Sequence, residues 1–182
     1  MRNPFEVRRE RAVHDAAFEQ MTEARSGIIA ADSPAGRARA LREFADACRA
    51  CAATSRPSRL RALMPGSPIL PRALTDAGVL AEAAAYSEQW LAEGRLDGTL
   101  PGAGAEFGDE AERMAWVRVF TVTGAADRCG AYSRLARVVE QRTGPAAAVV
   151  LGTVGRAYLI RSCPQAVSEG RVTVIDPGRA AS

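Results

Sequence analysis

Two side chains in the last third of the chain are of types that could perform covalent chemistry together. Cys129 stands at the predicted start of a helix, where free N–H groups and the helix dipole favour a thiolate. Gly130 would let a substrate come close to the sulfur. Asp176 ends a predicted strand and could orient a catalytic base. Each also has a structural interpretation, because cysteine often fills a core or capping position and aspartate before Pro-Gly often begins a turn.

A second pattern is the pair Cys48 and Cys51, which has the spacing of zinc and thiol-redox motifs. Zinc would need two further ligands, but the other cysteines stand singly and His14 is the only histidine. Redox motifs place the first cysteine at a helix N-terminus, whereas this pair falls in the middle of a predicted helix. We therefore interpret the pair as small apolar core residues, and the sequence implies no metal or cofactor.

The order of elements around Cys129 resembles a known enzyme group. A Met-x-Trp segment precedes the Cys-Gly pair, and a short helix, two strand-like runs and a hydrophobic-Asp-Pro turn follow it. This order resembles the transglutaminase-like, papain-related cysteine enzymes, and most closely the AvrPphE/HopX (XopE-type) group of type III effectors. The resemblance covers about residues 110–178 and implies Cys129 as nucleophile and Asp176 as triad acid. The residues that it places near the substrate and the oxyanion are Gly130, Trp116 and Tyr158.

The sequence departs from this group where the catalytic histidine is expected. Arg156 stands there, and a guanidinium can stabilise a thiolate but cannot take a proton from a thiol or deliver one to a leaving group. An active member would be a cysteine-dependent amide hydrolase or acyltransferase acting on a protein, with Cys129 as the attacking group. A degenerate member would bind a host or bacterial protein without turning it over. His14 is read as a partly buried helix residue, and the alternative role is that of a substitute base.

The resemblance also implies a virulence protein of the bacterial cytoplasm that a type III system exports into a host cell. The charged N-terminus has no apolar core of a Sec signal peptide. No apolar run reaches the roughly 18 to 20 residues of a membrane helix, so no membrane span is expected. The net charge is only +3 and the arginines are spread among acids, which makes a nucleic-acid partner unlikely on composition.

Helices are predicted over most of the chain that precedes the last strand-like runs. Ser33 and Pro34 form a strong helix start, with a hydroxyl N-cap followed by proline at the first helical position. Apolar residues at helical spacing predict helices over about residues 5–25, 34–53, 75–92, from 109 onward and 127–142. The apolar face expected for the third of these consists of Val79, Ala83, Tyr86 and Trp90.

Three strand-like runs, over residues 146–151, 156–161 and 171–175, complete the predicted architecture. The expected fold class is therefore α+β, with the Cys129 helix packed on a small antiparallel sheet. The expected organisation is a helical region over 1–54, a Pro/Ser/Arg-rich linker over 55–74 and a cysteine-enzyme-like region over 75–182, or one domain overall. The alternative function is a non-catalytic helical module that binds another protein.

Overall fold

The computed structural model describes residues 4–54, 71–96 and 108–164. Every regular element in these residues is an α-helix. In chain order the helices are α1 (Pro4–Ala30), α2 (Pro34–Thr54), α3 (Pro71–Ala92), α4 (Glu110–Thr121), α5 (Ala125–Thr143) and α6 (Pro145–Ser162).

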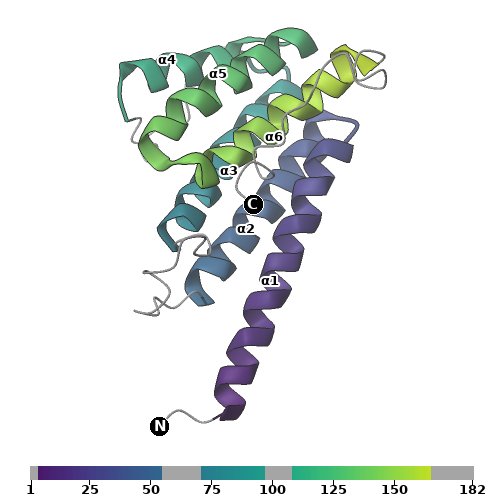
Figure 1. Ribbon diagram of the computed structural model, residues 1–182. Helices are drawn as coiled ribbons and strands as arrows, with labels where there is room; N and C mark the ends of the chain where they lie inside the picture. Colours follow the sequence, from purple (N-terminus) through teal and green to yellow (C-terminus); the bar gives the residue numbers. More distant parts are fainter. Residues whose placement is uncertain (1–3, 55–70, 97–107, 165–182) are drawn as a thin grey trace.

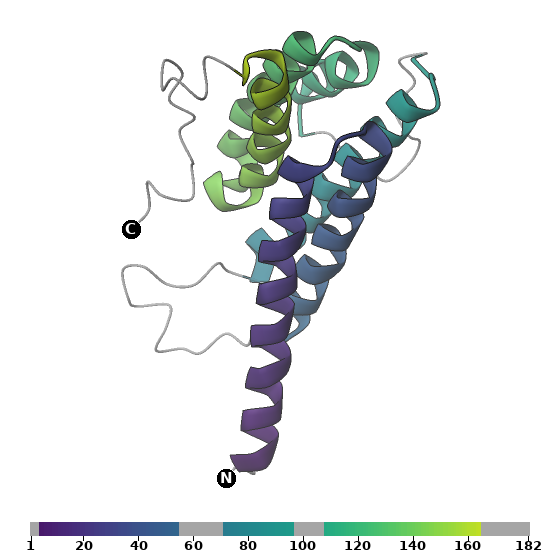
Figure 2. The same ribbon diagram turned by 90° about the vertical axis from the view of Figure 1, so that its right-hand side faces the viewer.

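The six helices form two groups that follow the chain order. Helices α1, α2 and α3 pack side by side, and α4, α5 and α6 lie across one end of them (Figures 1 and 2). Helix α6 is the main link between the groups, because it packs on α3 and α1 as well as on α5. Helix α1 is the longest, and its N-terminal end extends beyond the other helices (Figure 1).

The predicted α+β fold is wrong for the described residues, which contain no strand. The runs at 146–151 and 156–161 are not two strands but parts of the single helix α6. The third run, at 171–175, lies outside the described residues. Among the described residues, the Cys129 helix packs on the helices α6 and α4.

Helix α6 misled the strand prediction because it is apolar on nearly every side. Gly144 adopts a φ of 82° after α5, and Pro145 then begins α6 in the position that its fixed φ suits. The helix is buried between α5, α3 and α1, so it needs no polar face. A short apolar run cannot be assigned to a strand or to a buried helix by periodicity alone. No helix in the described part of the chain is both long and apolar enough to cross a membrane.

Two predicted helix starts are confirmed by their capping contacts. The hydroxyl of Ser33, the residue directly before α2, accepts a hydrogen bond at 3.1 Å from the N–H of Gly36 in the first turn of that helix. The Asp109 carboxylate accepts one from the Glu112 N–H at 2.8 Å at the start of α4. Both contacts satisfy N–H groups that have no partner within the helix.

Small residues let α2 and α3 approach each other closely. A Cβ added at Gly78 of α3 would lie 3.4 Å from both the Ala45 carbonyl oxygen and the Cys48 Cβ. Ala81 and Ala84, further along α3, are also buried. The interior of the α1–α3 group therefore contains many alanines beside larger buried side chains such as Leu41, Phe44 and Leu80.

Candidate functional site

Cys129 lies in the second turn of α5 and not at its N-terminus, because α5 begins four residues earlier. Burial and the nearby Cys163 raise the pKa of the Cys129 thiol, while a hydrogen bond with Ser133 opposes that rise. Burial is the largest of these effects. The thiol is therefore protonated at neutral pH, which is the opposite of the activated thiolate that the sequence predicted.

The other predicted site residues lie in different surroundings. Trp116 is buried in α4 with its ring 6.3 Å from that of Phe120, and Gly130 is exposed on α5. Arg156 is half-buried on α6, and Tyr158, two residues further along that helix, is buried. Their place as a substrate pocket therefore stays a prediction.

Asp176, the predicted triad acid, lies outside the described residues. Cys129 and the residues around Arg156 do belong to one helix pair, because α5 and α6 are closely packed. A Cβ added at Gly155 would lie 3.6 Å from the Cys129 carbonyl oxygen. The structure thus brings two of the predicted positions onto neighbouring helices, but His14 lies elsewhere, hydrogen-bonded to Thr54 at the end of α2.

Sequence reasoning missed a buried charge cluster centred on Glu88 of α3. Its carboxylate is fully buried and binds two arginines: Arg37 Nε of α2 donates to Oε2 at 2.9 Å, and Arg128 Nη2 of α5 donates to Oε1 at 2.6 Å. Two phenols complete its shell, with Tyr132 Oη donating to Oε1 at 3.0 Å and Tyr158 Oη donating to Oε2 at 2.7 Å. Four helices therefore meet at one carboxylate.

The arginines of this cluster also hold neighbouring groups. Arg128 Nη1 donates to the carbonyls of Val119 and Val122 at the C-terminal end of α4, at 3.0 and 2.9 Å. Arg37 Nη2 lies 2.8 Å from the Tyr158 hydroxyl, and its guanidinium carbon lies 4.4 Å from the centre of that ring. Carbonyls at the end of a helix lack partners within it, so Arg128 serves as a cap for α4.

The cluster is closed to solvent, which limits its chemistry. Burial, followed by the charge of Glu88, raises the pKa of Tyr158 to about 12 and that of Tyr132 well above its usual range. Both phenols therefore keep their protons and donate hydrogen bonds to the carboxylate. With two guanidinium groups and one carboxylate, the cluster carries one net positive charge. Its role is to join the two helix groups, since no substrate reaches a set of fully buried side chains.

A signal for this cluster was present in the sequence but was not used. Glu88 continues the series of small residues at Ala77, Ala81 and Ala84, at helical spacing, and an acid in such a series points to a buried partner. Nothing in the sequence says which of the 24 arginines supplies the opposite charge. Arg37 and Arg128 are 51 and 40 residues away from Glu88.

The predicted apolar face of α3 is the second feature of note, because it points outward. Val79 is 55% exposed and Tyr86 is 41% exposed, while Ala83 and Trp90 of the same stripe are half-buried. The face that packs on α2 is the opposite one, which contains Gly78 and Ala81. Ala83 and Trp90 pack against the core, with the Trp90 ring 5.1 Å from that of Phe120, so the exposed apolar part of this stripe consists of Val79 and Tyr86.

Comparisons of the chain with protein-family models, with curated proteins and with solved structures find no match.

Proposed function

We propose that this chain is a non-catalytic helical interaction module, and that it pairs with a second copy of itself through the outer face of α3. The observation that supports the proposal is the exposure of Val79 and Tyr86 on a helix whose other face is already packed. A helix that is apolar on both faces is normally covered on both. Trp90 and Ala83 of this face pack against the core, whereas the described residues leave Val79 and Tyr86 exposed.

The spacing of residues along this face supports a second copy as the partner. If two α3 helices pair antiparallel about a two-fold axis between residues 82 and 83, Val79 of one lies opposite Tyr86 of the other. The same register places Arg72 of one copy opposite Glu93 of the other, so opposite charges pair at each end of the contact. Such a two-fold contact uses the same surface on both copies, which is the commonest symmetry of protein oligomers.

The side chains at the ends are available for such a contact. The side chain of Arg72 is 91% exposed and only touches Asp76 at 3.9 Å, which is a long ion pair. Glu93 binds Gln89 and lies 3.7 Å from Arg95, both on the surface. Exposed ion pairs of this kind contribute little, so they can be exchanged for pairs across an interface. A contact along one helix buries area near the lower limit of specific interfaces, which favours a dimer of moderate affinity.

The cysteine-enzyme hypothesis is not carried forward. It depends on a sheet that the described residues lack and on an activated Cys129 thiol, and the pKa of that thiol is raised. No observation of the described residues favours a second function over the interaction module.

The test measures self-association by sedimentation velocity over a wide range of protein concentrations. The native chain is expected to dimerise, and Tyr86→Glu is expected to weaken the dimer about tenfold or more, because it buries a charge in the contact. Val13→Glu is the matched control, because Val13 is 49% exposed on α1, which packs on α2 and α6. It should leave the dimer unchanged.

A charge exchange tests the register itself. Arg72→Glu alone and Glu93→Arg alone each place like charges opposite each other and should weaken the dimer, whereas the two substitutions together should restore it. A native chain that stays monomeric at all concentrations would refute pairing with a second copy. A dimer that Tyr86→Glu leaves intact would show that another surface is used.

A further inference from the structure

Two sulfur atoms from different helices meet in the core between α1 and α2. The Cys48 thiol donates to the Met21 thioether sulfur at 3.6 Å, and both side chains are buried. Cys51 lies one turn further along α2 and is also buried. Positions 48 and 51 are three residues apart on α2, so the two cysteines are neighbours on the helix. The Cys-x-x-Cys pair that the sequence left as core residues therefore has a third sulfur beside it.

The spacing of these sulfurs suits a metal ion bound by two or three of them. Metal–thiolate bonds are about 2.3 Å long, so three sulfurs around one ion in a plane lie about 4 Å apart. The Met21–Cys48 separation of 3.6 Å is close to that value. Residues three apart on a helix are neighbours on its surface, so Cys51 can join them through a rotamer change.

The donor set selects the kind of ion. Among the described residues, no group of three or more His, Cys, Asp and Glu side chains could hold a metal, so a tetrahedral zinc set is not present there. Met21 supplies a thioether sulfur beside the two thiols, and thioether and thiolate sulfur together select Cu(I). We propose that Met21, Cys48 and Cys51 form a binding site for a soft monovalent cation, Cu(I), between α1 and α2.

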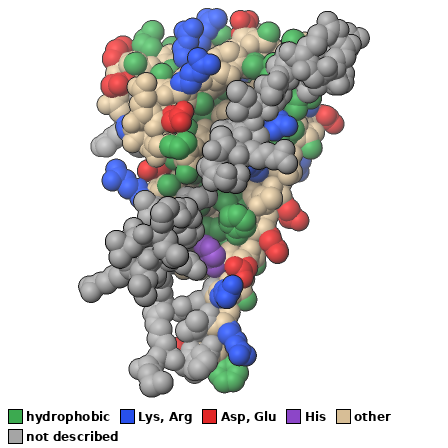
Figure 3. Space-filling model, in the orientation of Figure 1, with side chains coloured by type: hydrophobic (Ala, Val, Ile, Leu, Met, Phe, Trp, Pro, Cys, Tyr) green, Lys and Arg blue, Asp and Glu red, His purple; other side chains and the backbone are tan. Residues whose placement is uncertain are grey.

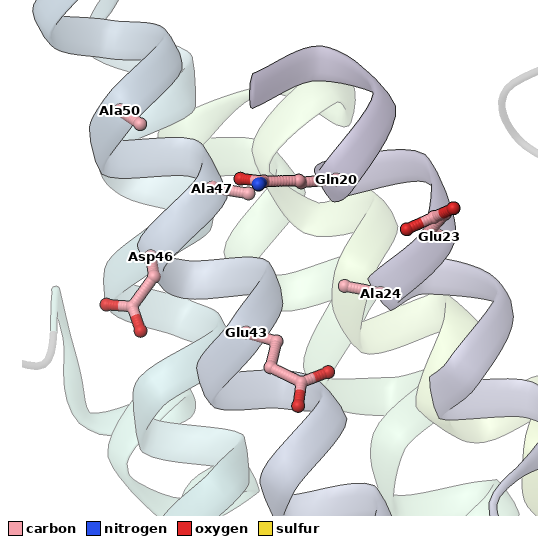
Figure 4. A pocket seen from close by; sticks show the side chains of 7 residues that line it. All are labelled: Gln20, Glu23, Ala24, Glu43, Asp46, Ala47 and Ala50. Carbon is pink, nitrogen blue, oxygen red and sulfur yellow. The ribbon is translucent and has the colours of Figure 1, made fainter. Parts of the chain in front are cut away.

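The surface beside the site attracts cations. A groove of about 550 Å³ runs along the α1–α2 contact, with Glu23 on α1 and Glu43 and Asp46 on α2 among its lining residues (Figure 4). Ala47, which precedes Cys48, also lines it. Acidic side chains are visible along the exposed edge of α1 (Figure 3). The groove thus provides an acidic approach to the side of the helix pair that holds the sulfurs.

Entry requires only that part of α1 moves away from α2. Val13 and Phe18, which are nearer than Met21 to the extending N-terminal end of α1, are 49% and 51% exposed. Segments with few buried contacts open at a lower free energy than the rest of a protein. On binding, each ligating thiol gives up its proton to solvent and forms a sulfur–copper bond, while copper stays Cu(I) throughout.

The test is an anaerobic competition between the protein and bathocuproine disulfonate for Cu(I), followed through the colour of the copper–chelator complex. The native chain is expected to remove one equivalent of Cu(I) from the chelator. The variant Cys129→Ala/Cys163→Ala, which keeps both core thiols, is the matched control and should bind the same amount. The variant Cys48→Ala/Cys51→Ala should bind none at this affinity.

A third variant keeps the test decisive if the core double variant fails to fold, which circular dichroism would reveal. Met21→Leu preserves the volume of the side chain and removes only the thioether, so it should fold and weaken Cu(I) binding about tenfold or more. The proposal is overturned if the folded native chain takes no Cu(I) from the chelator. It is equally overturned if binding is lost in the Cys129/Cys163 control, or if Met21→Leu binds as tightly as the native chain.

Discussion

The interior of the α1–α3 group and its junction with α4–α6 are built in opposite ways. In the middle of the α2–α3 contact, the small residue Gly78 lies against the Ala45 backbone and the Cys48 side chain. At the junction, the contact is one carboxylate, Glu88, held by two guanidinium groups and two phenols. Small residues permit many alternative registers, whereas a buried charge has one set of partners. We expect the junction to fix how the two groups are oriented.

A second buried carboxylate sharpens this comparison. Glu112 of α4 is also buried and receives two hydrogen bonds from Arg142 of α5, at 2.8 and 2.7 Å. The Arg142 side chain, however, is 44% exposed, whereas Arg37 and Arg128 are fully buried. Water can therefore replace Glu112 as a partner but cannot replace Glu88. The exposure of the arginine, more than the geometry of the ion pair, decides how much each carboxylate contributes to the free energy of unfolding.

The largest effect is expected from Glu88→Gln. The substitution keeps the shape of the side chain but leaves Arg37 and Arg128 buried without an opposite charge, which should lower the free energy of unfolding by about 3–5 kcal/mol. Glu112→Gln should lower it by about 1 kcal/mol or less, because Arg142 stays hydrated. Urea unfolding followed by circular dichroism measures both. Equal losses in the two variants would contradict the comparison.

A smaller effect is expected at alkaline pH. Burial raises the pKa of Cys48 to about 12 in the apolar group and that of Tyr158 to about 12 at the junction. When folding raises the pKa of a group, the stability that the group contributes is complete below its unfolded-state pKa. That stability is lost as the pH rises through the folded-state pKa. Stability should therefore fall between about pH 9 and 12, by an amount on the order of a few kcal/mol.

The two groups can be separated by substitution. The Cys48 pKa rises from 9.0 and the Tyr158 pKa from 10.0, so Cys48 contributes more to the loss than Tyr158 does. Cys48→Ala should flatten the pH dependence more than Tyr158→Phe does, when unfolding is measured at several pH values. The opposite order would place the main alkaline sensitivity at the junction.

The smallest effects are expected from two glycines. Gly78→Val would push α2 and α3 apart and should cost about 1–3 kcal/mol, because an added Cβ already lies at 3.4 Å from two atoms. Gly152→Ala on α6 meets nothing within 4 Å and should stabilise the chain by about 0.5–1 kcal/mol through helix propensity. Thermal unfolding of both variants checks the pair. A tolerated Gly78→Val would mean that the α2–α3 contact is not tightly packed.

Local patterns predicted much of the helical structure, and long-range contacts explain what they missed. The starts of α2 and α4 follow from Ser33 and Asp109, which act on backbone groups within the next turn. Leu135 and Val139 were expected on the inner face of α5 and are fully buried. The sheet was wrong because the apolar run of α6 fits a strand and a buried helix equally well. The choice depends on α3, α1 and α5, which surround α6.

The sequence by itself determined where most of the described helices begin, and it determined the periodic faces that α2 and α5 bury. Capping and side-chain periodicity act within a few residues, so they can be read from the chain. Only the tertiary structure decided that Val79 and Tyr86 face outward, that Glu88 joins Arg37 to Arg128, and that Met21 lies beside Cys48. These contacts join residues that are tens of positions apart, and packing selects them from many partners of the same chemical type.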